Sequence, residues 1–424
     1  MNIIEIINKK RNNEYLTKEE ISYVINGYLN ETILDYQMSS LLMAICINGM
    51  NEEEIFTLTD IMLNSGDKIN LDFIEGIKVD KHSTGGIGDK TTIILAPLVA
   101  SAGVPVSKMS GRGLGITGGT IDKLESIENF NVYVNKEDYI KQAKEIGIVI
   151  SAQTGNLVPA DKKIYALRDV SGTTNSVPLI AASIMSKKLA SGADKFVLDV
   201  KVGSGALMKD IASARELANI MIKIGKNYNK EVVCVLSNMN EPLGCNIGNG
   251  LEVLEAIDIL NNKGDEKLRN LVLKLGSIMV SLSKNISEEE AYNLLITNIE
   301  NKKGYNKLLE LVKYQNGNIN NIKISNLKKE IYASKSGYIN LSANLVGNFV
   351  HNLGAGRLSK DDVIDYGVGI ILNKKTGDKV NEGELLATVY YNENKKPDFN
   401  KLNEIIKIED NIINKQDLIL EVIK

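Results

Sequence analysis

The chain has 424 residues, of which 43% are hydrophobic and 24% charged, and its formal net charge is −3 at pH 7. This length predicts two or three domains, and the composition is typical of a soluble globular protein. The slightly acidic balance argues against a nucleic acid or a membrane surface as a partner, because both attract a basic face. The sequence has no run of about twenty apolar residues. Charges occupy the N-terminal positions where a signal peptide has its apolar core, so we expect a cytoplasmic protein.

The first 66 residues are predicted to be helical. Thr17 and Glu20 have the spacing of a capping box ahead of an apolar periodic segment. Residues 32–48 are apolar on a broad face, and Asn51 precedes three glutamates, which is typical of a helix N-terminus. These helices carry no recognisable chemistry, so their apolar faces are expected to form core or a subunit interface.

Two glycine-rich loops follow in close succession. Residues 77–79 are predicted to be a buried strand, the loop 82–89 carries three glycines, and the apolar run 92–102 is predicted to be a helix. The same order recurs over residues 104–127. A strand, a glycine loop and a helix N-terminus in succession direct backbone N–H groups and the positive end of the helix dipole at an anion.

The side chains around these loops favour phosphate as the anion. Lys81 and Lys108 supply positive charge, and no pattern typical of a nucleoside triphosphate or dinucleotide site is present. For any single residue, a turn or a helix cap is the better interpretation. Two loops of the same chemistry in one stretch favour phosphate binding. The predicted hydroxyl donors are Ser83, Thr92, Ser110 and Thr120.

The middle of the chain alternates between strands and helices. Strands are predicted at 131–134, 148–152, 195–202 and 232–236, with a helix at 136–146. This alternation predicts a mostly parallel sheet, in which ligands bind beyond the carboxyl ends of the strands.

Residues 156–191 interrupt this alternation with two predicted helices, which we expect to return to the N-terminal helical domain. Ser183 and Lys187 are four residues apart and therefore share a helix face, and Arg168 lies near the end of the preceding helix. The residues alone leave a solvated helix face as the better interpretation of Lys187.

We therefore predict an α/β protein with three parts. A helical N-terminal domain covers residues 1–66 and is completed by 156–192. A mixed, mostly parallel-sheet α/β domain that binds phosphate covers 67–155 and 193–312. Residues 313–325 are the best candidate for a linker, since they are rich in asparagine and contain glycine. Short β runs and turns predict a β-rich C-terminal α+β domain over 326–424.

The strings KHSTGGIGDK and SGRGLGITGGTIDKLE resemble the thymidine and pyrimidine-nucleoside phosphorylase family, and the likeness extends over nearly the whole chain. The resemblance implies reversible phosphorolysis of pyrimidine nucleosides to the free base and ribose or deoxyribose 1-phosphate. It also implies a homodimer formed through the N-terminal helices. Lys108 favours the broad enzyme, which accepts uridine and deoxyuridine as well as thymidine, over a thymidine-restricted one. Ile116 stands where the family commonly has histidine, so the sugar or base pocket is expected to differ.

The same resemblance implies roles for individual residues. Arg168, Ser183 and Lys187 fall where the family binds the pyrimidine base, and Arg168 and Lys187 would stabilise the departing base anion. His82, with an ordinary pKa of about 6.5, either protonates the base or only positions its neighbours. The implied phosphate-binding residues are Lys81, His82, Ser83, Thr92, Lys108, Met109, Ser110 and Thr120.

A potassium ion is the one cofactor that the resemblance implies, with inorganic phosphate as co-substrate. Backbone carbonyls of Gly88, Lys90, Leu243 and Asn246, together with the carboxylate of Glu255, would hold the ion, since a hard cation prefers oxygen ligands. Lys90 and Asn246 are not the residues expected there. If only their carbonyls bind, the side chains do not matter. If the Lys90 ammonium turns inward, it replaces the ion.

Two other functions remain as alternatives. An anthranilate-type phosphoribosyltransferase would need an adjacent Asp-Glu pair for magnesium, whereas the string LDVKVGSG offers only Asp199. A non-catalytic nucleoside-binding paralogue is disfavoured because the full set of charged and hydroxyl residues is present.

Overall fold

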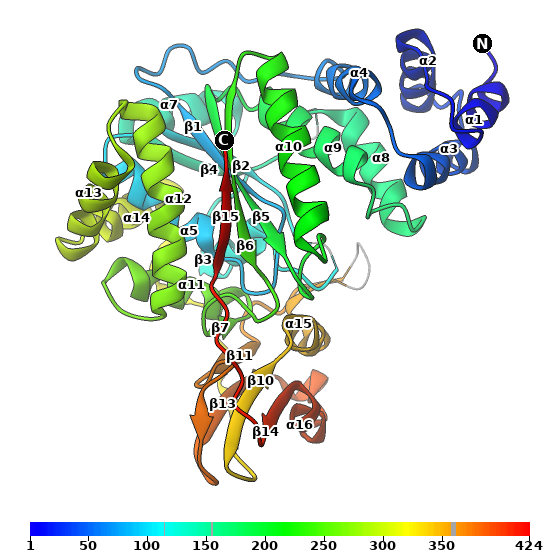
Figure 1. Cartoon of the computed structure of the whole chain (residues 1–424). Helices are drawn as coiled ribbons and strands as arrows, with labels where there is room; N and C mark the ends of the chain where they lie inside the picture. The colour runs from blue at the N-terminus through cyan, green and yellow to red at the C-terminus, as the bar shows by residue number, and fades with distance from the viewer. Residues whose placement is uncertain (114, 154–155, 358–361) are drawn as a thin grey trace.

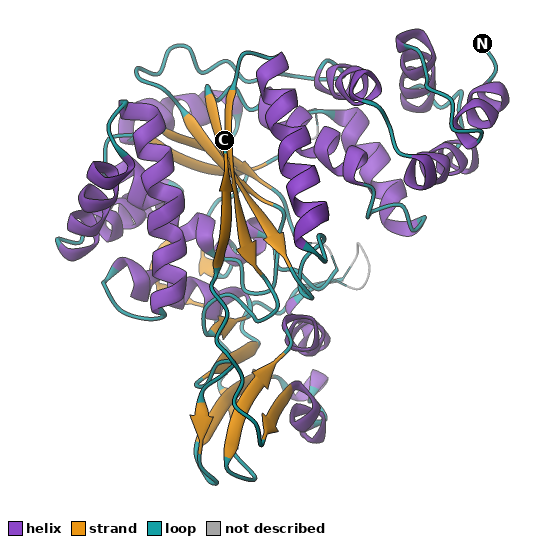
Figure 2. Cartoon of the chain, viewed as in Figure 1, coloured by secondary structure: helices purple, strands orange, loops and turns teal. Residues whose placement is uncertain are grey.

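The computed structural model describes residues 1–113, 115–153, 156–357 and 362–424. A helical part, a central α/β part and a β-rich part follow one another across the molecule (Figure 1). The predicted fold class is confirmed, with helices concentrated in the first two parts and antiparallel strands in the third (Figure 2).

The helical part joins segments from two regions of the sequence, because helices within residues 159–190 pack against helices within residues 18–63. Thr17 and Glu20 form the expected capping box, and Asn51 forms a second one with Glu54. The Lys10 ammonium lies 2.8 Å from the buried Glu54 carboxylate. The helices are α1 (Ile3–Arg11), α2 (Lys18–Leu29), α3 (Asp35–Asn48), α4 (Glu52–Leu63), α8 (Pro159–Val170) and α9 (Val177–Ala190).

A four-stranded sheet forms the centre of the α/β part, in the order β1 (Val79–Ser83), β5 (Lys195–Val202), β6 (Glu231–Asn238) and β15 (Ile419–Ile423). The first three strands are parallel, and β15 pairs antiparallel with β6. Both faces of β5 are buried, which explains its nearly continuous apolar run. Phe196 and Leu198 pack into the core beside α10 (Ile211–Asn227), and Val197 packs into the core that contains α5 (Thr91–Ser101) and α12 (Glu266–Lys284).

A second, two-stranded parallel sheet joins β2 (Val106–Ser110) and β4 (Ile148–Ala152). Its β2 contacts β1, so the two glycine loops follow strands that lie close together. The remaining elements of this part are α6 (Thr120–Leu124), β3 (Ile127–Glu128), α7 (Lys136–Ile146), β7 (Asn246–Ile247), α11 (Asn249–Leu260), α13 (Glu288–Glu300) and α14 (Lys303–Tyr314).

The predicted strand at 131–134 is wrong. The side chain of Asn131 accepts the backbone N–H of Tyr133, and this local turn competes with an extended ladder. Gln315 holds Asn131 at both its N–H and its carbonyl, while Ser151 donates to the Val132 carbonyl. Isolated backbone bonds to Gln315 and Ala152, together with the side chains of Gln315 and Ser151, therefore satisfy this segment without a regular strand ladder.

The predicted linker at 313–325 is also structured. Helix α14 extends to Tyr314, Gln315 is buried, and β8 (Asn318–Ile322) pairs with β3. The asparagines that suggested a linker lie mostly on exposed positions of β8, where polar side chains are tolerated.

The C-terminal part contains two antiparallel sheets, in the orders β12-β10-β14 and β7-β11-β13-β9. The second sheet takes β7 from the α/β part. The strands are β9 (Leu327–Tyr332), β10 (Gly337–Leu341), β11 (Gly369–Leu372), β12 (Lys379–Val380), β13 (Leu385–Tyr391) and β14 (Ile406–Glu409). The helical segments are α15 (Ala343–Val350), η1 (His351–Ala355), η2 (Glu393–Lys395), η3 (Phe399–Lys401) and α16 (Leu402–Ile405).

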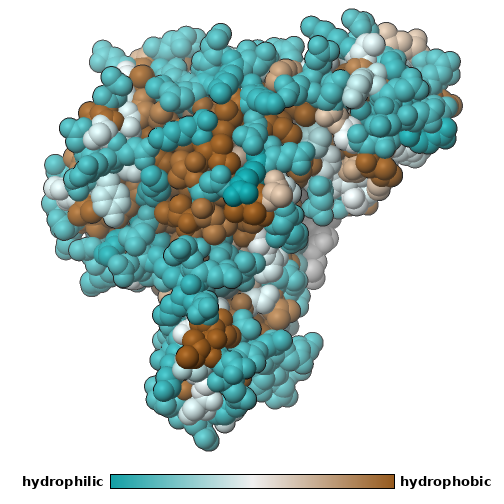
Figure 3. All heavy atoms as spheres, in the orientation of Figure 1, coloured by the Kyte–Doolittle hydropathy of each residue, from teal (hydrophilic) through white to brown (hydrophobic). Residues whose placement is uncertain are grey.

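The last strand leaves the C-terminal part and ends in the middle of the α/β part (Figure 1). Hydrophobic side chains gather on this face between α10 and α12 (Figure 3). Ile419 and Val422 pack against the main core, so β15 covers an edge of the sheet that would otherwise be open. Among the described residues, no helix combines the length and the apolar character needed to cross a membrane.

Candidate active site

The two predicted phosphate loops begin at neighbouring strand ends. His82 and Ser83 end β1, and Ser110 ends β2. The Lys108 ammonium on β2 donates to the Lys81 carbonyl on β1 at 2.6 Å, which joins the two strands just before the loops. Backbone and hydroxyl groups of both loops therefore face the same region beyond the sheets.

Lys81 lies beneath the first loop. Its buried ammonium donates to the Thr91 hydroxyl at 2.5 Å and lies 3.7 Å from the Asp199 carboxylate. Burial lowers the pKa of Lys81, although Asp89 and Asp199 oppose that shift. Lys81 thus joins β1 to the first residue of α5, Thr91, and this contact fixes the two ends of the first loop relative to each other.

Asp89 organises the first loop, and sequence reasoning missed it. The Ser83 hydroxyl donates to Asp89 Oδ2 at 2.5 Å, and the Thr91 N–H donates to Oδ1 at 3.1 Å. Burial opposes ionisation, but Lys81, Lys201 and Lys123 hold the pKa of Asp89 well below its usual range. The signal in the sequence was an acidic residue between the glycines and the helix that follows.

Lys108 is buried among other charges. It lies 3.5 Å from Asp80, whose other oxygen accepts from Lys188 at 2.6 Å. Burial lowers the pKa of Lys108 to about 7, with Lys188 and Lys81 adding to the shift and Asp80 opposing it. Its charge is therefore sensitive to binding of an anion near neutral pH.

The other predicted phosphate residues are less uniform. Ser110 Oγ is buried without a hydrogen-bond partner in the described structure, as a hydroxyl awaiting a ligand would be. Met109 and Thr92 are buried, and Thr120 is the first residue of α6. Met109 packs in the core shared with the helical part, so any contact it makes with phosphate comes from its backbone.

Replacing Ser110 by alanine is expected to raise the KM for phosphate roughly tenfold or more, which is the value of one hydrogen bond to a charged group. The melting temperature is expected to stay unchanged, because the substitution removes a hydroxyl that has no partner. Ser107→Ala is the matched control, since Ser107 Oγ is also buried and unpaired but lies three residues before Ser110, near the start of β2. An equal rise in both variants would contradict a phosphate contact at Ser110.

The second loop is closed by the C-terminal part. Asp122 accepts the Gly113 N–H at 2.5 Å and also binds Arg112 and Arg357, each at 3.0 Å. Gly119 permits this closure, because a Cβ atom there would lie 2.1 Å from the Gly113 nitrogen. Arg357, from the C-terminal part, thus helps to hold the second loop in place.

Arg168, Ser183 and Lys187 lie together on α8 and α9. The Lys187 ammonium donates to Ser183 Oγ at 2.9 Å and to Asp161 Oδ2 at 2.6 Å. The ring of Tyr165 lies between the two cations, 5.7 Å from the Arg168 guanidinium and 5.5 Å from the Lys187 ammonium. Asp161 and Tyr165 were missed, although their spacing from Arg168 places all three on one helix face.

Arg168 has a structural function in this arrangement. Its guanidinium donates to the carbonyls of Thr173, Thr174 and Leu179 at 3.1, 2.8 and 3.2 Å. The side chain is buried, and burial lowers its pKa. It fixes the turn between α8 and α9, and thereby the position of α9 and Lys187.

The base residues lie within electrostatic reach of the phosphate loops. Burial and the nearby charges of Lys188, Lys108, Lys187 and Lys81 place the pKa of His82 well below its ordinary value. His82 is therefore uncharged at neutral pH before substrate binds. The Lys188 ammonium on α9 lies 2.6 Å from Asp80 on β1, so the helix that carries Lys187 lies beside the strand that leads into the first loop.

Three of the five groups implied for potassium converge on one point, the carbonyls of Leu243 and Asn246 and the carboxylate of Glu255, and the Lys90 ammonium occupies that point. The Gly88 carbonyl accepts the backbone N–H of Lys90 at 2.9 Å. The Lys90 ammonium lies 2.9 Å from the Leu243 carbonyl, 2.6 Å from the Asn246 carbonyl and 2.5 Å from Glu255 Oε2. Gly88, with φ +76°, allows the Leu243 carbonyl to approach, since a Cβ atom there would lie 2.6 Å from that oxygen. A potassium ion bound to the same three oxygens would lie next to the Lys90 ammonium, and two positive charges so close together repel strongly. The residues therefore do not fit a potassium ion in addition to Lys90.

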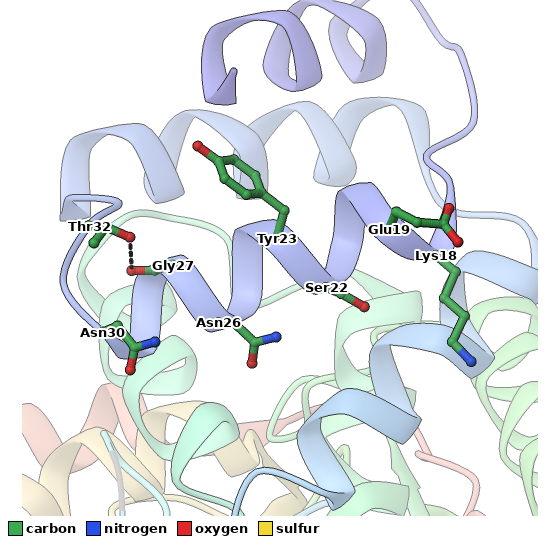
Figure 4. A pocket seen from close by; sticks show the side chains of 8 residues that line it. All are labelled: Lys18, Glu19, Ser22, Tyr23, Asn26, Gly27, Asn30 and Thr32. Atoms are coloured by element: carbon green, nitrogen blue, oxygen red, sulfur yellow. Dashed lines mark hydrogen bonds between the residues drawn. The ribbon is translucent and has the colours of Figure 1, made fainter. Parts of the chain in front are cut away.

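A separate hollow lies on the surface of the helical part, along α2 and the turn after it (Figure 4). Its lining is mostly polar and its side chains are largely exposed; the Thr32 hydroxyl donates to the Gly27 carbonyl at 3.1 Å. It is far along the chain from the glycine loops and offers no comparable group of converging charges. Its lining residues are Lys18, Glu19, Ser22, Tyr23, Asn26, Gly27, Asn30 and Thr32.

The fold and the family models define a glycosyl transferase. Family models match the chain in three consecutive pieces: a glycosyl transferase helical bundle domain over residues 4–66, a glycosyl transferase a/b domain over 75–312, and a pyrimidine nucleoside phosphorylase C-terminal domain over 338–409. A pyrimidine-nucleoside phosphorylase of Staphylococcus haemolyticus is 53% identical over 418 residues, which is 96% of each chain. One of Staphylococcus aureus is 51% identical over 97% of this chain and 98% of its own. The chain belongs to the pyrimidine-nucleoside phosphorylase family.

A solved structure shares the fold at low sequence identity. The anthranilate phosphoribosyltransferase of Thermus thermophilus aligns with a TM-score of 0.59 and 17% identity, covering 73% of this chain and 99% of that one. The likeness concerns the fold alone.

Proposed function

We propose that the chain catalyses the reversible phosphorolysis of pyrimidine nucleosides. A phosphate oxygen forms a bond to C1′ of the sugar while the bond from C1′ to the base nitrogen breaks. The electron pair of that bond leaves with the base, which then takes up a proton. The products are the free pyrimidine and ribose or deoxyribose 1-phosphate.

The observation that carries this proposal is the 2.6 Å contact between Lys188 on α9 and Asp80 on β1, which brings the helix that carries Lys187 beside the strand that leads into the first glycine loop. A cation on α9 can stabilise negative charge on the departing base, and the loops can hold the nucleophile on the other side of the sugar. Holding both reactants in this way is worth about 7–11 kcal/mol of an activation barrier. Relatives 51% and 53% identical that carry the name pyrimidine-nucleoside phosphorylase support the same conclusion.

Incubation with nucleosides in the presence and absence of phosphate tests the proposal. We expect free uracil and thymine from uridine, deoxyuridine and thymidine only when phosphate is present. Release of no base from any pyrimidine nucleoside would contradict the proposal. Consumption of phosphoribosyl diphosphate with magnesium would indicate the phosphoribosyltransferase reaction, and binding without cleavage would indicate a non-catalytic paralogue.

Lys108 is proposed to bind phosphate in a pH-dependent manner. Because its pKa is about 7, it is charged below that pH and neutral above it. We expect the ratio of phosphate KM between Lys108→Met and the unmodified protein to be largest at pH 6 and to fall towards one by pH 9. The ratio cancels the ionisation of phosphate itself. A ratio that does not change with pH would show that Lys108 does not titrate in this range.

Cleavage of uridine relative to thymidine by the same variant tests whether Lys108 sets the broad substrate range.

We further propose that the chain forms a homodimer through its N-terminal helices. Tyr36, Met43 and Ile47 share one face of α3 and are 68%, 40% and 74% exposed, and Ile4 on the adjoining α1 is 59% exposed. Exposed apolar side chains gathered in this way are typical of a protein interface. Light scattering checks the proposal, since a protomer has a mass of 46.5 kDa.

A further inference from the structure

The ammonium group of Lys90 has the surroundings of a bound metal ion. A lysine ammonium has three donors, and these three are matched by the carbonyls of Leu243 and Asn246 and the carboxylate of Glu255. Backbone carbonyls arranged around a point are also the groups with which proteins replace the hydration shell of potassium. The side chain of Lys90 is fully buried, so water does not compete for these oxygens.

The same carboxylate organises the turn 242–246. Glu255 accepts the backbone N–H groups of Cys245 at 2.7 Å and of Asn246 at 2.9 Å. A buried carboxylate of this kind needs a positive partner close by. Lys90 supplies that partner from within the chain, at a distance of 2.5 Å.

Lys90 also connects this turn to the first phosphate loop. It lies between Asp89, which accepts from Ser83, and Thr91, whose hydroxyl accepts from Lys81. The position of its backbone therefore affects the loop on one side, while its side chain is fixed to the turn 242–246 on the other. A cation at this point orders both segments at once.

We propose that the ammonium group of Lys90 takes the place of a monovalent cation, so that this chain orders the turn 242–246 against its first phosphate loop without potassium. The inference concerns the site beside the phosphate loop and rests on the proposed phosphorolysis only where activity is the readout.

The unmodified protein gives the first test. Replacing potassium by tetramethylammonium at constant ionic strength is expected to leave both the melting temperature and kcat/KM unchanged, because an ion that does not bind the folded state does not stabilise it. Tetramethylammonium is too large to enter the site. A saturable rise of either quantity with potassium concentration would overturn the proposal.

Lys90→Ser gives the second test, because serine leaves the position of the ammonium vacant and open to an ion. In tetramethylammonium we expect kcat/KM to fall roughly tenfold or more, the effect of losing a charge-assisted hydrogen bond. Added potassium is expected to restore kcat/KM and to raise the melting temperature in a saturable manner. Lys90→Met, which fills the space without a charge, is expected to show no response to potassium.

Lys375 provides a matched control. Its partly buried ammonium donates to two other carbonyls of the same turn, those of Pro242 at 2.5 Å and Gly244 at 2.7 Å, but it has no contact with Glu255. Lys375→Ser is expected to lower stability without creating a response to potassium. An equal response in Lys90→Ser and Lys375→Ser would overturn the proposal. If Lys90→Ser does not fold, the potassium titration of the unmodified protein still decides it.

The two proposals fail in different ways. If the proposed function is wrong, no phosphate-dependent base release will be seen at any potassium concentration. If the cation proposal is wrong, the melting temperature of the unmodified protein will rise with potassium, and this result does not depend on the identity of the substrate.

Discussion

Replacing Lys187 by methionine is expected to lower kcat for nucleoside cleavage by about 10²–10³-fold, the usual effect of removing one donor that stabilises a developing anion. Two of the three ammonium hydrogens are used by Ser183 and Asp161, which leaves one for a carbonyl oxygen of the departing base. The KM for phosphate is expected to change little, because the proposed mechanism assigns Lys187 to the departing base and not to phosphate. Steady-state kinetics with uridine and varied phosphate measure both quantities.

Lys187→Met also removes a partner of Asp161. A second variant separates the resulting loss of stability from the loss of kcat. Asp161 is buried, its Oδ1 has no partner in the described structure, and Lys187 donates to its Oδ2. Lys187→Met is therefore expected to lower stability as well. Adding Asp161→Asn removes the unpaired charge and is expected to restore the melting temperature but not kcat. Recovery of activity in the double variant would contradict a direct role of Lys187. Lys162→Met, at an exposed position of α8, is the control for loss of a lysine.

Arg168→Met is expected to lower the free energy of unfolding by roughly 3 kcal/mol or more, because it removes three hydrogen bonds from a buried, charged donor, at about 1.5–3 kcal/mol each. Those carbonyls belong to Thr173, Thr174 and Leu179, in and after the turn that joins α8 to α9. Since the same turn positions Lys187, kcat/KM is expected to fall together with stability. Urea denaturation measures the first quantity and initial rates measure the second.

Arg269→Met is the matched control for Arg168. Arg269 donates to Asn262 at an exposed site on α12, and its loss is expected to change the free energy of unfolding by less than about 0.5 kcal/mol. Arg168→Lys is expected to recover little, since one ammonium cannot reproduce the planar guanidinium that serves three carbonyls. A large loss of activity in Arg168→Met with unchanged stability would mean that Arg168 acts on the base and not on the turn.

Local patterns predicted most of the fold. The glycine loops, the helix N-termini and the capping box at Thr17 depend on residues within a few positions of one another, and all of them are found in the structure. The strand at 131–134 failed because its backbone is satisfied by Gln315 and Ser151. No pattern within residues 131–134 contains that information.

In the candidate site, too, residues within a motif could be predicted, whereas residues whose partners lie in distant segments could not. Its residues on the glycine loops and on α9 were predictable because motifs carry them. Asp89, Asp161 and Tyr165 were not, because their importance comes from partners in other segments. For Lys90 the sequence allowed two outcomes, and only the distance to Glu255 distinguishes them.

The pairing of β15 with β6 has a consequence for biosynthesis. All the residues between 239 and 418 leave the ribosome before the strand that completes the central sheet becomes available. During that interval the outer edge of β6 exposes unpaired backbone groups, which can pair with another nascent chain. A pairing between strands so far apart in sequence also forms slowly. The interval between synthesis of β6 and synthesis of β15 is thus the period in which the edge of the central sheet is most exposed to aggregation.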